Sequence, residues 1–262
     1  MLPTPDTSHV PFERVYEPAE DSYLLLDTLS APSETAFLTS RFGTGSPSST
    51  SAAAPTPLVV EIGTGSGVVV AFIAAQAHKI FGTRDVLTAG VDLNGFACRA
   101  TNATVSRARA ENPATCSNAW LGAAMGDLTG PLRPGCVDVL VFNPPYVPSP
   151  ELPAQSSETL VAGERKTTFD EDSYLLSLSY AGGRDGMETT DRLIEALPGV
   201  LSERGCAYIL LCAQNKPQEV KSRIEEFGDG WRAMTVGESG KQAGWEKLQI
   251  IRVWRDGRHT PS

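Results

Sequence analysis

Short apolar runs alternate along the chain with longer stretches in which apolar residues recur at helical spacing. The runs predict strands at residues 58–62, 86–93, 119–123, 137–142 and 206–212, the last opened by Gly205. The longer stretches predict helices at residues 68–78, 95–110 and around 193–201, where Pro198 is expected to kink or reset the helix. Strands that alternate with helices predict a mainly parallel sheet covered on both faces.

The C-terminal part has a different pattern. Two strand-like runs, residues 232–236 and 247–254, flank the turn-rich stretch 237–244 and predict a closing antiparallel hairpin. The seven predicted strands and the length of 262 residues fit one large α/β domain, residues 1–262.

Within this domain, an N-terminal segment at residues 1–57 precedes a core at residues 58–262. Residues 43–57 are rich in Ser, Thr, Ala, Gly and Pro, which is the composition of a flexible insert. Residues 149–172 read as a polar loop, expected to be either a lid beside the site or a tolerated insertion.

Charge and cysteine content exclude several classes of protein. A formal net charge of -9 argues against a chain that grips nucleic acid by itself, because phosphate binding needs clustered Lys and Arg. The five cysteines include no Cys-x-x-Cys pair, so neither a disulfide framework nor a zinc or other metal site is predicted. The N-terminus has no apolar signal region and no stretch reaches membrane-spanning length, so we expect a cytoplasmic protein, with nuclear entry left open.

A glycine loop follows the first strand of the core. Glu61, Gly63, Gly65 and Gly67 form Glu-x-Gly-x-Gly-x-Gly, and glycines let the backbone approach a ligand closely. A dinucleotide fingerprint needs Gly or Ala where this chain has Val68, and an acidic residue nearer than Asp92, so the spacing disfavours a nicotinamide cofactor.

The same spacing suits S-adenosylmethionine, which has no pyrophosphate. Asp92 at the end of the second strand can accept hydrogen bonds from both ribose hydroxyls, and Asp127 after the third can accept from the adenine amino group. Taken alone, the glycine loop could be a structural turn and each acid a helix cap or a solvated loop residue. The order of Asp92, Asp127 and Asn143 after successive strands favours the cofactor site.

The fourth predicted strand runs straight into Asn143-Pro144-Pro145-Tyr146. The two prolines have no backbone N–H, so this turn offers carbonyl oxygens and the Asn143 side chain with few competing donors. Such acceptors suit a planar NH₂ group, whose nitrogen is a poor nucleophile until its N–H groups are held and its electron density is raised. The motif therefore predicts group transfer to an amide or aromatic amine nitrogen, and no general base is evident.

Five blocks carry a resemblance to a known family: residues 15–26, residues 61–70, Asp92-Leu93-Asn94, residues 142–147 and residues 181–186, with Gln242-Ala243-Gly244 also matching. With them the chain resembles the HemK-type class I methyltransferases that methylate a glutamine side-chain amide, and among these the eukaryotic catalytic subunits that act on the class-1 translation release factor. The resemblance implies a Rossmann-like, seven-stranded, mainly parallel sheet with a C-terminal antiparallel hairpin.

The resemblance also assigns roles to residues. It implies that the cofactor S-adenosylmethionine contacts Ser22, Glu61, Gly63, Gly65, Asp92, Asp127, Leu128 and Asn143. Glu20 and Asp21 would help to close the N-terminal segment over the cofactor. Asn143, Pro144, Pro145 and Tyr146 would hold the glutamine, with the Asn143 side-chain oxygen and the Pro144 carbonyl accepting its two N–H bonds and Tyr146 packing against the amide plane.

Family members of this eukaryotic type work with a small zinc-binding activator subunit that pairs with the edge of the third strand, here about Ala119 to Ala123. The implied substrate is the glutamine of the Gly-Gly-Gln loop of the release factor. The inserts at residues 43–57 and 149–172 are longer than usual for the family, and Ser22 stands where the family often has Thr.

Three other functions compete with this interpretation. A methyltransferase for adenine or guanine amino groups would use the same tetrapeptide, but the acidic composition and the lack of an evident target-recognition domain argue against it. A lysine-directed enzyme needs no planar clamp of acceptors, because its substrate amine is sp³. A cofactor-binding scaffold without catalysis is disfavoured by the intact Asn143 and the intact glycines.

Overall fold

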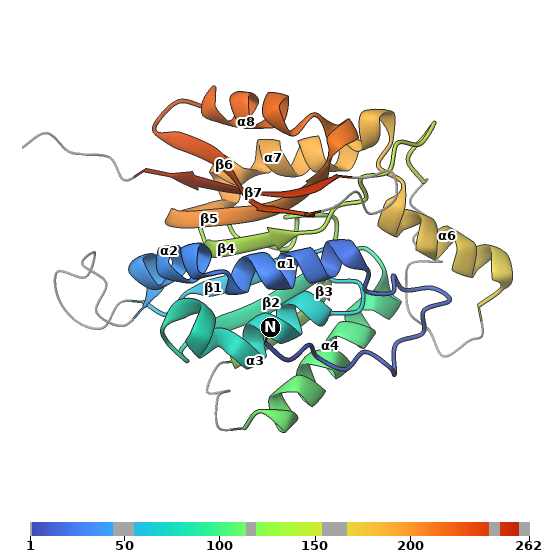
Figure 1. Cartoon of the computed structure of the whole chain (residues 1–262). Helices are drawn as coiled ribbons and strands as arrows, with labels where there is room; N and C mark the ends of the chain where they lie inside the picture. The colour runs from blue at the N-terminus through green and yellow to red at the C-terminus, as the bar shows by residue number, and fades with distance from the viewer. Residues whose placement is uncertain (1, 44–54, 114–118, 154–166, 241–246, 257–262) are drawn as a thin grey trace, which may run out of the picture.

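The computed structural model describes residues 2–43, 55–113, 119–153, 167–240 and 247–256 and builds them around one seven-stranded sheet (Figure 1). The strands are β1 (Leu58–Ile62), β2 (Leu87–Asp92), β3 (Ala119–Met125), β4 (Val137–Phe142), β5 (Leu201–Cys212), β6 (Trp231–Glu238) and β7 (Leu248–Arg255). Their order is β3-β2-β1-β4-β5-β7-β6; β1 to β5 pair in parallel and β7 is antiparallel to both neighbours. The predicted fold class is confirmed.

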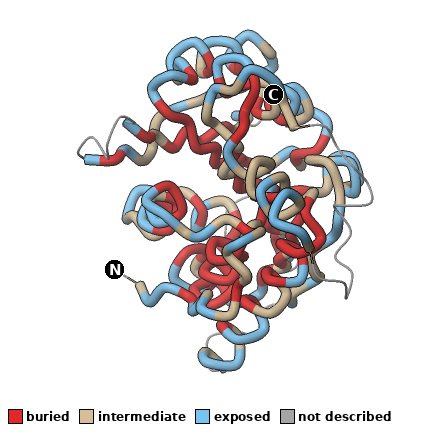
Figure 2. Tube along the Cα trace, turned by 90° about the vertical axis from the view of Figure 1, so that its right-hand side faces the viewer, coloured by how far each residue is buried: buried red, intermediate tan, exposed pale blue. Residues whose placement is uncertain are grey.

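Helices cover both faces of the sheet because the central strands are apolar on both sides. The helices are α1 (Glu20–Ser30), α2 (Pro32–Phe42), α3 (Val68–Phe81), α4 (Gly95–Glu111), α6 (Phe169–Tyr180), α7 (Glu188–Val200) and α8 (Pro217–Glu225), with short 3₁₀ turns η1 (Arg184–Gly186) and η2 (Ala213–Asn215). Val139 and Val141 of β4 pack with α1, α2 and α3, whereas the alternate residues Leu140 and Phe142 pack with α7 and α8. Figure 2 shows the buried residues running through the middle of the molecule, between exposed outer turns.

Two backbone expectations differ in detail from the structure. Helix α7 runs through Pro198 to Val200, so it is not reset there, and a kink at Pro198 stays a prediction. Proline removes one N–H, the donor to the Ile194 carbonyl, and the Leu201 N–H still closes the end of the helix on the Leu197 carbonyl. Strand β5 begins at Leu201, four residues before Gly205, because its pairing with β4 shifts register between the Val137 and Val139 positions.

Gly205 is required at that irregularity. A Cβ atom there would lie 2.8 Å from the Val137 carbonyl oxygen and 3.0 Å from the Leu201 Cβ atom, so a larger residue would push β5 away from β4.

The two predicted loops are only partly described. The predicted insert at 43–57 lies mostly outside the described residues, as does most of the predicted loop at 149–172 and the Gln242-Ala243-Gly244 match. The end of the second loop is helical: Thr168 caps α6 by accepting from the Glu171 N–H, and Glu171 accepts a hydrogen bond from the Thr168 N–H in return. The division of the chain into a segment and a core stays a prediction.

Cys98, Cys136, Cys206 and Cys212 are free thiols, and Cys116 lies outside the described ranges. Within those ranges, no helix combines the length and apolar character needed to cross a bilayer.

A buried ion pair fastens the N-terminal helices to the sheet. Glu34 of α2 accepts hydrogen bonds from Arg252 Nη1 at 2.6 Å and from the Tyr208 hydroxyl at 2.9 Å. The Arg252 guanidinium also lies 3.6 Å from the centre of the Phe37 ring. Because Glu34 and Arg252 are both buried, each depends on the other for the stabilisation of its charge that water would otherwise provide.

Removing one partner of this pair is expected to destabilise the fold strongly. Glu34→Ala leaves Arg252 buried without its counter-charge and should lower the free energy of unfolding by about 3–5 kcal/mol, measured by urea denaturation. The matched control is Glu195→Ala on the exposed face of α7, where a change within about 0.5 kcal/mol is expected. Equal stability of the two variants would contradict the assigned role of the pair.

Candidate active site

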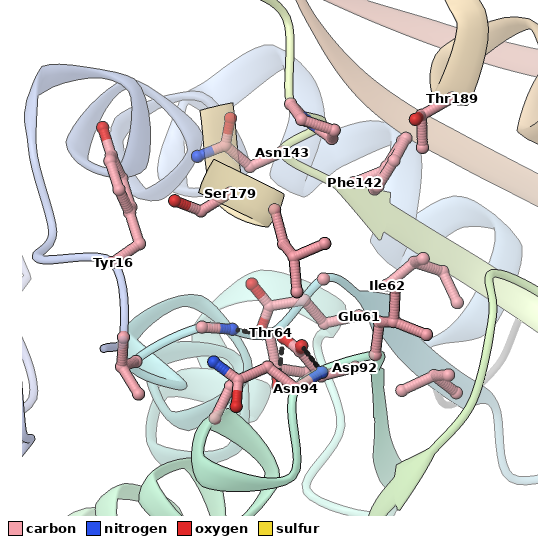
Figure 3. Close-up of a pocket in the computed structure, with 18 of the residues that line it drawn as sticks. Tyr16, Glu61, Ile62, Thr64, Asp92, Asn94, Phe142, Asn143, Ser179 and Thr189 are labelled. Atoms are coloured by element: carbon pink, nitrogen blue, oxygen red, sulfur yellow. Dashed lines mark hydrogen bonds between the residues drawn. The ribbon is translucent and has the colours of Figure 1, made fainter. Parts of the chain in front are cut away.

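A pocket opens at the carboxyl ends of β1, β2 and β4, where the strand order reverses between β1 and β4. Ligands of open α/β sheets bind at such a switch point. The pocket is lined by the predicted cofactor residues: Ser22, Glu61, Gly63, Gly65, Asp92, Asp127, Leu128 and Asn143. In Figure 3, Asp92 and Asn94 lie together on one side of the pocket, Asn143 and Ser179 lie on the other, and Glu61 lies between them.

The glycine loop joins β1 to α3 with three glycines at positive φ. Gly63 and Gly65 have φ of +66° and +51° and line the pocket, and a side chain on Gly65 would meet Tyr16 across it. Gly67 serves packing instead, since a Cβ atom there would lie 2.6 Å from the Thr101 Cα atom of α4. The left-handed backbone therefore favours glycine at the first two positions, which line the pocket, and the close approach of α4 requires it at the third.

Asp92 ends β2 and holds the glycine loop in place. Its Oδ2 atom accepts a hydrogen bond from the Gly65 N–H at 2.8 Å, and its Oδ1 atom accepts from the Asn94 N–H at 2.8 Å. The Thr64 hydroxyl also lies 3.5 Å from Oδ2. Oδ1 therefore keeps a lone pair for one ribose hydroxyl, and Oδ2 can accept the other where this long contact gives way. Burial raises the pKa of Asp92, and the backbone donors only partly offset that effect.

Glu61 is the most deeply placed acid of the site. It lies near the end of β1, and its Oε2 atom accepts from the Val70 N–H in the first turn of α3 at 2.9 Å. Burial raises the pKa of Glu61 well above its ordinary value of 4.5, and the nearby charge of Asp92 raises it further. A cationic or donor-rich ligand would favour the ionised form of both acids, and S-adenosylmethionine has sulfonium, amine and hydroxyl groups of this kind.

Asp127 and Leu128 follow β3 at the other end of the pocket. Asp127 forms an ion pair with Arg192 of α7, a partner that the sequence did not indicate. One carboxylate oxygen of Asp127 makes this contact and the other is left for the predicted adenine amino group. Leu128 has φ of +48°, a left-handed conformation that is uncommon for leucine, and it contributes an apolar wall to the pocket.

Asn143 lies at the end of β4 with one half of its amide held and the other half unpaired. Its Nδ2 atom donates to Asp21 Oδ2 at 3.1 Å. Its Oδ1 atom is buried and has no hydrogen-bond partner among the described residues. A buried acceptor without a donor costs free energy, so this oxygen is suited to a donor brought by a ligand.

The other residues of the tetrapeptide are held by contacts with the core, with Asp21 and with Asn215. Pro145 lines the pocket and Pro144 is buried. Tyr146 packs on the core, its hydroxyl lies 3.5 Å from Asp21 Oδ2, and its carbonyl accepts from Asn215 Nδ2 at 3.2 Å. Asn215 also donates to the carbonyls of Asp185 and Gly186, so it ties the tetrapeptide to the block at residues 181–186.

Several lining residues were not predicted. Arg14 and Tyr16 come from the N-terminal segment, Leu175, Leu178 and Ser179 from α6, and Thr189 and Arg192 from α7. The helical spacing of Leu175 and Leu178 is a signal for the α6 wall, but it lies just beyond the stretch read as a polar loop. The Asn94 side chain holds the backbone of Arg14, because Asn94 Nδ2 donates a hydrogen bond to the Arg14 carbonyl at 2.8 Å.

Comparison with known proteins agrees with this geometry. No family model matches the chain. It is 33% identical over 258 residues to the mouse protein Methyltransferase HEMK2, covering 96% of each chain, and 31% identical over 256 residues to the human one, covering 95% of each. It is 30% identical over 263 residues to the eRF1 methyltransferase catalytic subunit mtq2 of Schizosaccharomyces pombe, covering 98% of this chain and 97% of that protein.

Among solved structures, the E. cuniculi Mtq2-Trm112 complex, responsible for methylation of the eRF1 translation termination factor, matches with a TM-score of 0.50 and 23% identity. The match covers 93% of this chain and 99% of that one, and it supports the fold.

The sheet topology and the acids at its strand ends define a class I methyltransferase that uses S-adenosylmethionine. Sequence identity of 30–33% to relatives over nearly their full length also shows the family. The chain belongs to the HemK-type methyltransferases. The predicted family, enzyme class and cofactor are thereby confirmed, while the roles of the individual site residues stay predictions.

Burial of the Glu61 carboxyl predicts that removing its charge raises the stability of the ligand-free protein and weakens its binding of S-adenosylmethionine. Its raised pKa means that the folded protein holds this proton more tightly than the unfolded chain. Ionising it costs stability, which is therefore lost as pH rises from the unfolded pKa through the folded pKa. Glu61→Gln can keep the bond from Val70 without the charge, so the ligand-free variant should melt at a higher temperature than the wild type at about pH 8, with a difference that shrinks toward about pH 4.

The same variant should bind S-adenosylmethionine about tenfold more weakly in calorimetry, the effect of losing one charged hydrogen-bond acceptor. Glu225→Gln on the exposed face of α8 is the control, and it should change neither quantity. A Glu61→Gln variant that is less stable than the wild type at the higher pH would contradict the argument from burial.

Proposed function

We propose that the protein methylates the side-chain amide of glutamine, and that its substrate is the Gly-Gly-Gln loop of the class-1 translation release factor. The observation that carries the proposal is the unpaired, buried Oδ1 atom of Asn143 at the end of β4. The relatives whose names include a release factor support the choice of substrate.

The residues of the tetrapeptide prepare the amide nitrogen for attack. S-adenosylmethionine supplies a methyl group on a positively charged sulfur. Asn143 Oδ1 accepts one N–H of the glutamine amide, the Pro144 carbonyl accepts the other, and Tyr146 packs against the amide plane. Two accepted hydrogen bonds orient the nitrogen and increase its electron density, and the surplus proton leaves after transfer. Asn143 Oδ1 is covered in the present arrangement, so entry of the substrate requires neighbouring side chains to move.

The lining of the pocket supports the placement of the cofactor beside Asn143. Acceptors for ribose hydroxyls lie at Asp92, and apolar walls for an adenine ring come from Ile62, Leu128 and Phe142. Asn143 lies across the pocket from Asp92 (Figure 3), which is the side where a reacting group on the far end of the nucleoside would be held.

Methyl transfer from labelled S-adenosylmethionine to the release factor tests the proposal. We expect label on the wild-type factor and none on a factor whose Gly-Gly-Gln glutamine is changed to asparagine, which keeps the amide but shortens its reach. The assay is run with and without the small zinc-binding subunit. Label that persists after the change, or label on nucleic acid or lysine instead, would contradict the proposed substrate.

We further propose that the small zinc-binding activator subunit pairs with β3. This strand is an edge of the sheet, and its side chains Leu121 and Met125 are 58% and 44% exposed. An edge strand with apolar side chains invites pairing with another chain, and a partner strand would satisfy its free backbone groups. The Mtq2-Trm112 complex, in which a protein of this fold is assembled with a second chain, supports a partner of this kind. A cytoplasmic location stays a prediction that agrees with a release factor substrate.

A charge on this edge should prevent pairing. Leu121→Asp is expected to abolish co-purification with the zinc-binding subunit, because burying the carboxylate in an apolar interface is costly. Met234→Asp provides the control, since Met234 is 44% exposed on β6 at the opposite edge of the sheet. Retained binding by Leu121→Asp, or equal loss in both variants, would place the partner elsewhere.

A further inference from the structure

Asp21 lies at the centre of a hydrogen-bond cluster that joins the N-terminal segment to the tetrapeptide. Its Oδ2 atom accepts from the Tyr16 hydroxyl at 3.0 Å and from Asn143 Nδ2 at 3.1 Å, with the Tyr146 hydroxyl at 3.5 Å. Its Oδ1 atom accepts from the Ser22 N–H at 2.6 Å and from the Ser22 hydroxyl at 3.2 Å. Asp21 itself is only 3% exposed, so this geometry is not loosened by water.

The cluster determines which end of the Asn143 amide faces the pocket. A carboxamide has an oxygen that accepts and a nitrogen that donates, and the two ends are nearly the same size. An acceptor at Asp21 Oδ2 fixes the nitrogen of Asn143 on that side and leaves the oxygen for a ligand. With a donor at the same position, the amide would turn over and present its NH₂ group to the substrate NH₂ group.

We propose that Asp21 is a positioning residue for methyl transfer: it acts through Asn143, by holding that side chain with its oxygen toward the substrate amide. This inference rests on the proposed function and goes beyond closing the N-terminal segment over the cofactor. The negative charge of the carboxylate also polarises the Asn143 amide through the hydrogen bond, which strengthens Oδ1 as an acceptor. Asp21 does not touch the reacting atoms in this account.

A nearly isosteric change tests the orientation. In Asp21→Asn the oxygen stays on the Ser22 N–H, so the new NH₂ group takes the place of Oδ2 and faces the Asn143 NH₂ group. The turnover number kcat should fall about 10²-fold, toward the loss of roughly 10²–10³ expected for Asn143→Ala. The Kd for S-adenosylmethionine should change less than about threefold. Asp27→Asn, the same change at an exposed position of α1, is the control.

A double-mutant cycle separates positioning from general support of the fold. If Asp21 acts through Asn143, adding Asp21→Asn to Asn143→Ala should lower kcat by less than about threefold further. The exchange Asp21→Asn with Asn143→Asp restores a donor facing an acceptor and an oxygen facing the substrate. It should therefore be at least about tenfold more active than either single variant. A residue that only stabilises the fold would give neither result.

Two outcomes would overturn the inference: kcat of Asp21→Asn within about threefold of the wild type, or losses that multiply in the double variant. Failure of the proposed function is seen separately, as a wild-type enzyme that does not label the glutamine. In that case the contact between Asp21 and Asn143 can be tested without measuring turnover. The probe is the pair of side-chain amide protons of Asn143, which are assigned by their loss in Asn143→Ala. Their nuclear magnetic resonance signals should shift in Asp21→Asn and stay unchanged in Asp27→Asn; unchanged signals in Asp21→Asn would reject the contact.

Discussion

The hydrogen bond from Asn143 to Asp21 joins the two parts of the chain that make the site. Asn143 ends a central strand of the sheet, and Asp21 lies in the first turn of α1, 122 residues away in sequence. On its own, the strand end would present an amide free to turn either way. With Asp21 buried against it, the same amide becomes a fixed acceptor next to the predicted cofactor pocket.

Buried acceptors are the common theme of this pocket, and they cost stability. Burial raises the pKa of both Glu61 and Asp92, and Asn143 Oδ1 has no donor among the described residues. These groups destabilise the ligand-free protein, and we expect hydroxyl, amine and amide donors of the ligands to satisfy them. The fold offsets this cost elsewhere, in a core that packs both faces of β4.

The sequence predicted what depends on local pattern. Apolar runs located all seven strands, and because the carboxyl ends of parallel strands share an edge, Glu61, Asp92 and Asn143 could be placed in one site from their positions in the sequence. Contacts between distant segments could not be predicted in this way. The ion pair of Asp127 with Arg192 and the α6 wall depend on how helices cross the sheet. Local rules also failed at Gly205, where the glycine permits an irregularity inside β5 instead of opening the strand.

The orientation of a substrate glutamine against Asn143 tests the central claim most directly. A crystal structure of the protein with the product cofactor S-adenosylhomocysteine and a peptide containing Gly-Gly-Gln would measure it. We expect the glutamine nitrogen within about 3.2 Å of Asn143 Oδ1, with Asn143 Nδ2 still on Asp21. A glutamine amide bound away from Asn143, or an Asn143 side chain that has left Asp21 to bind it, would contradict the account.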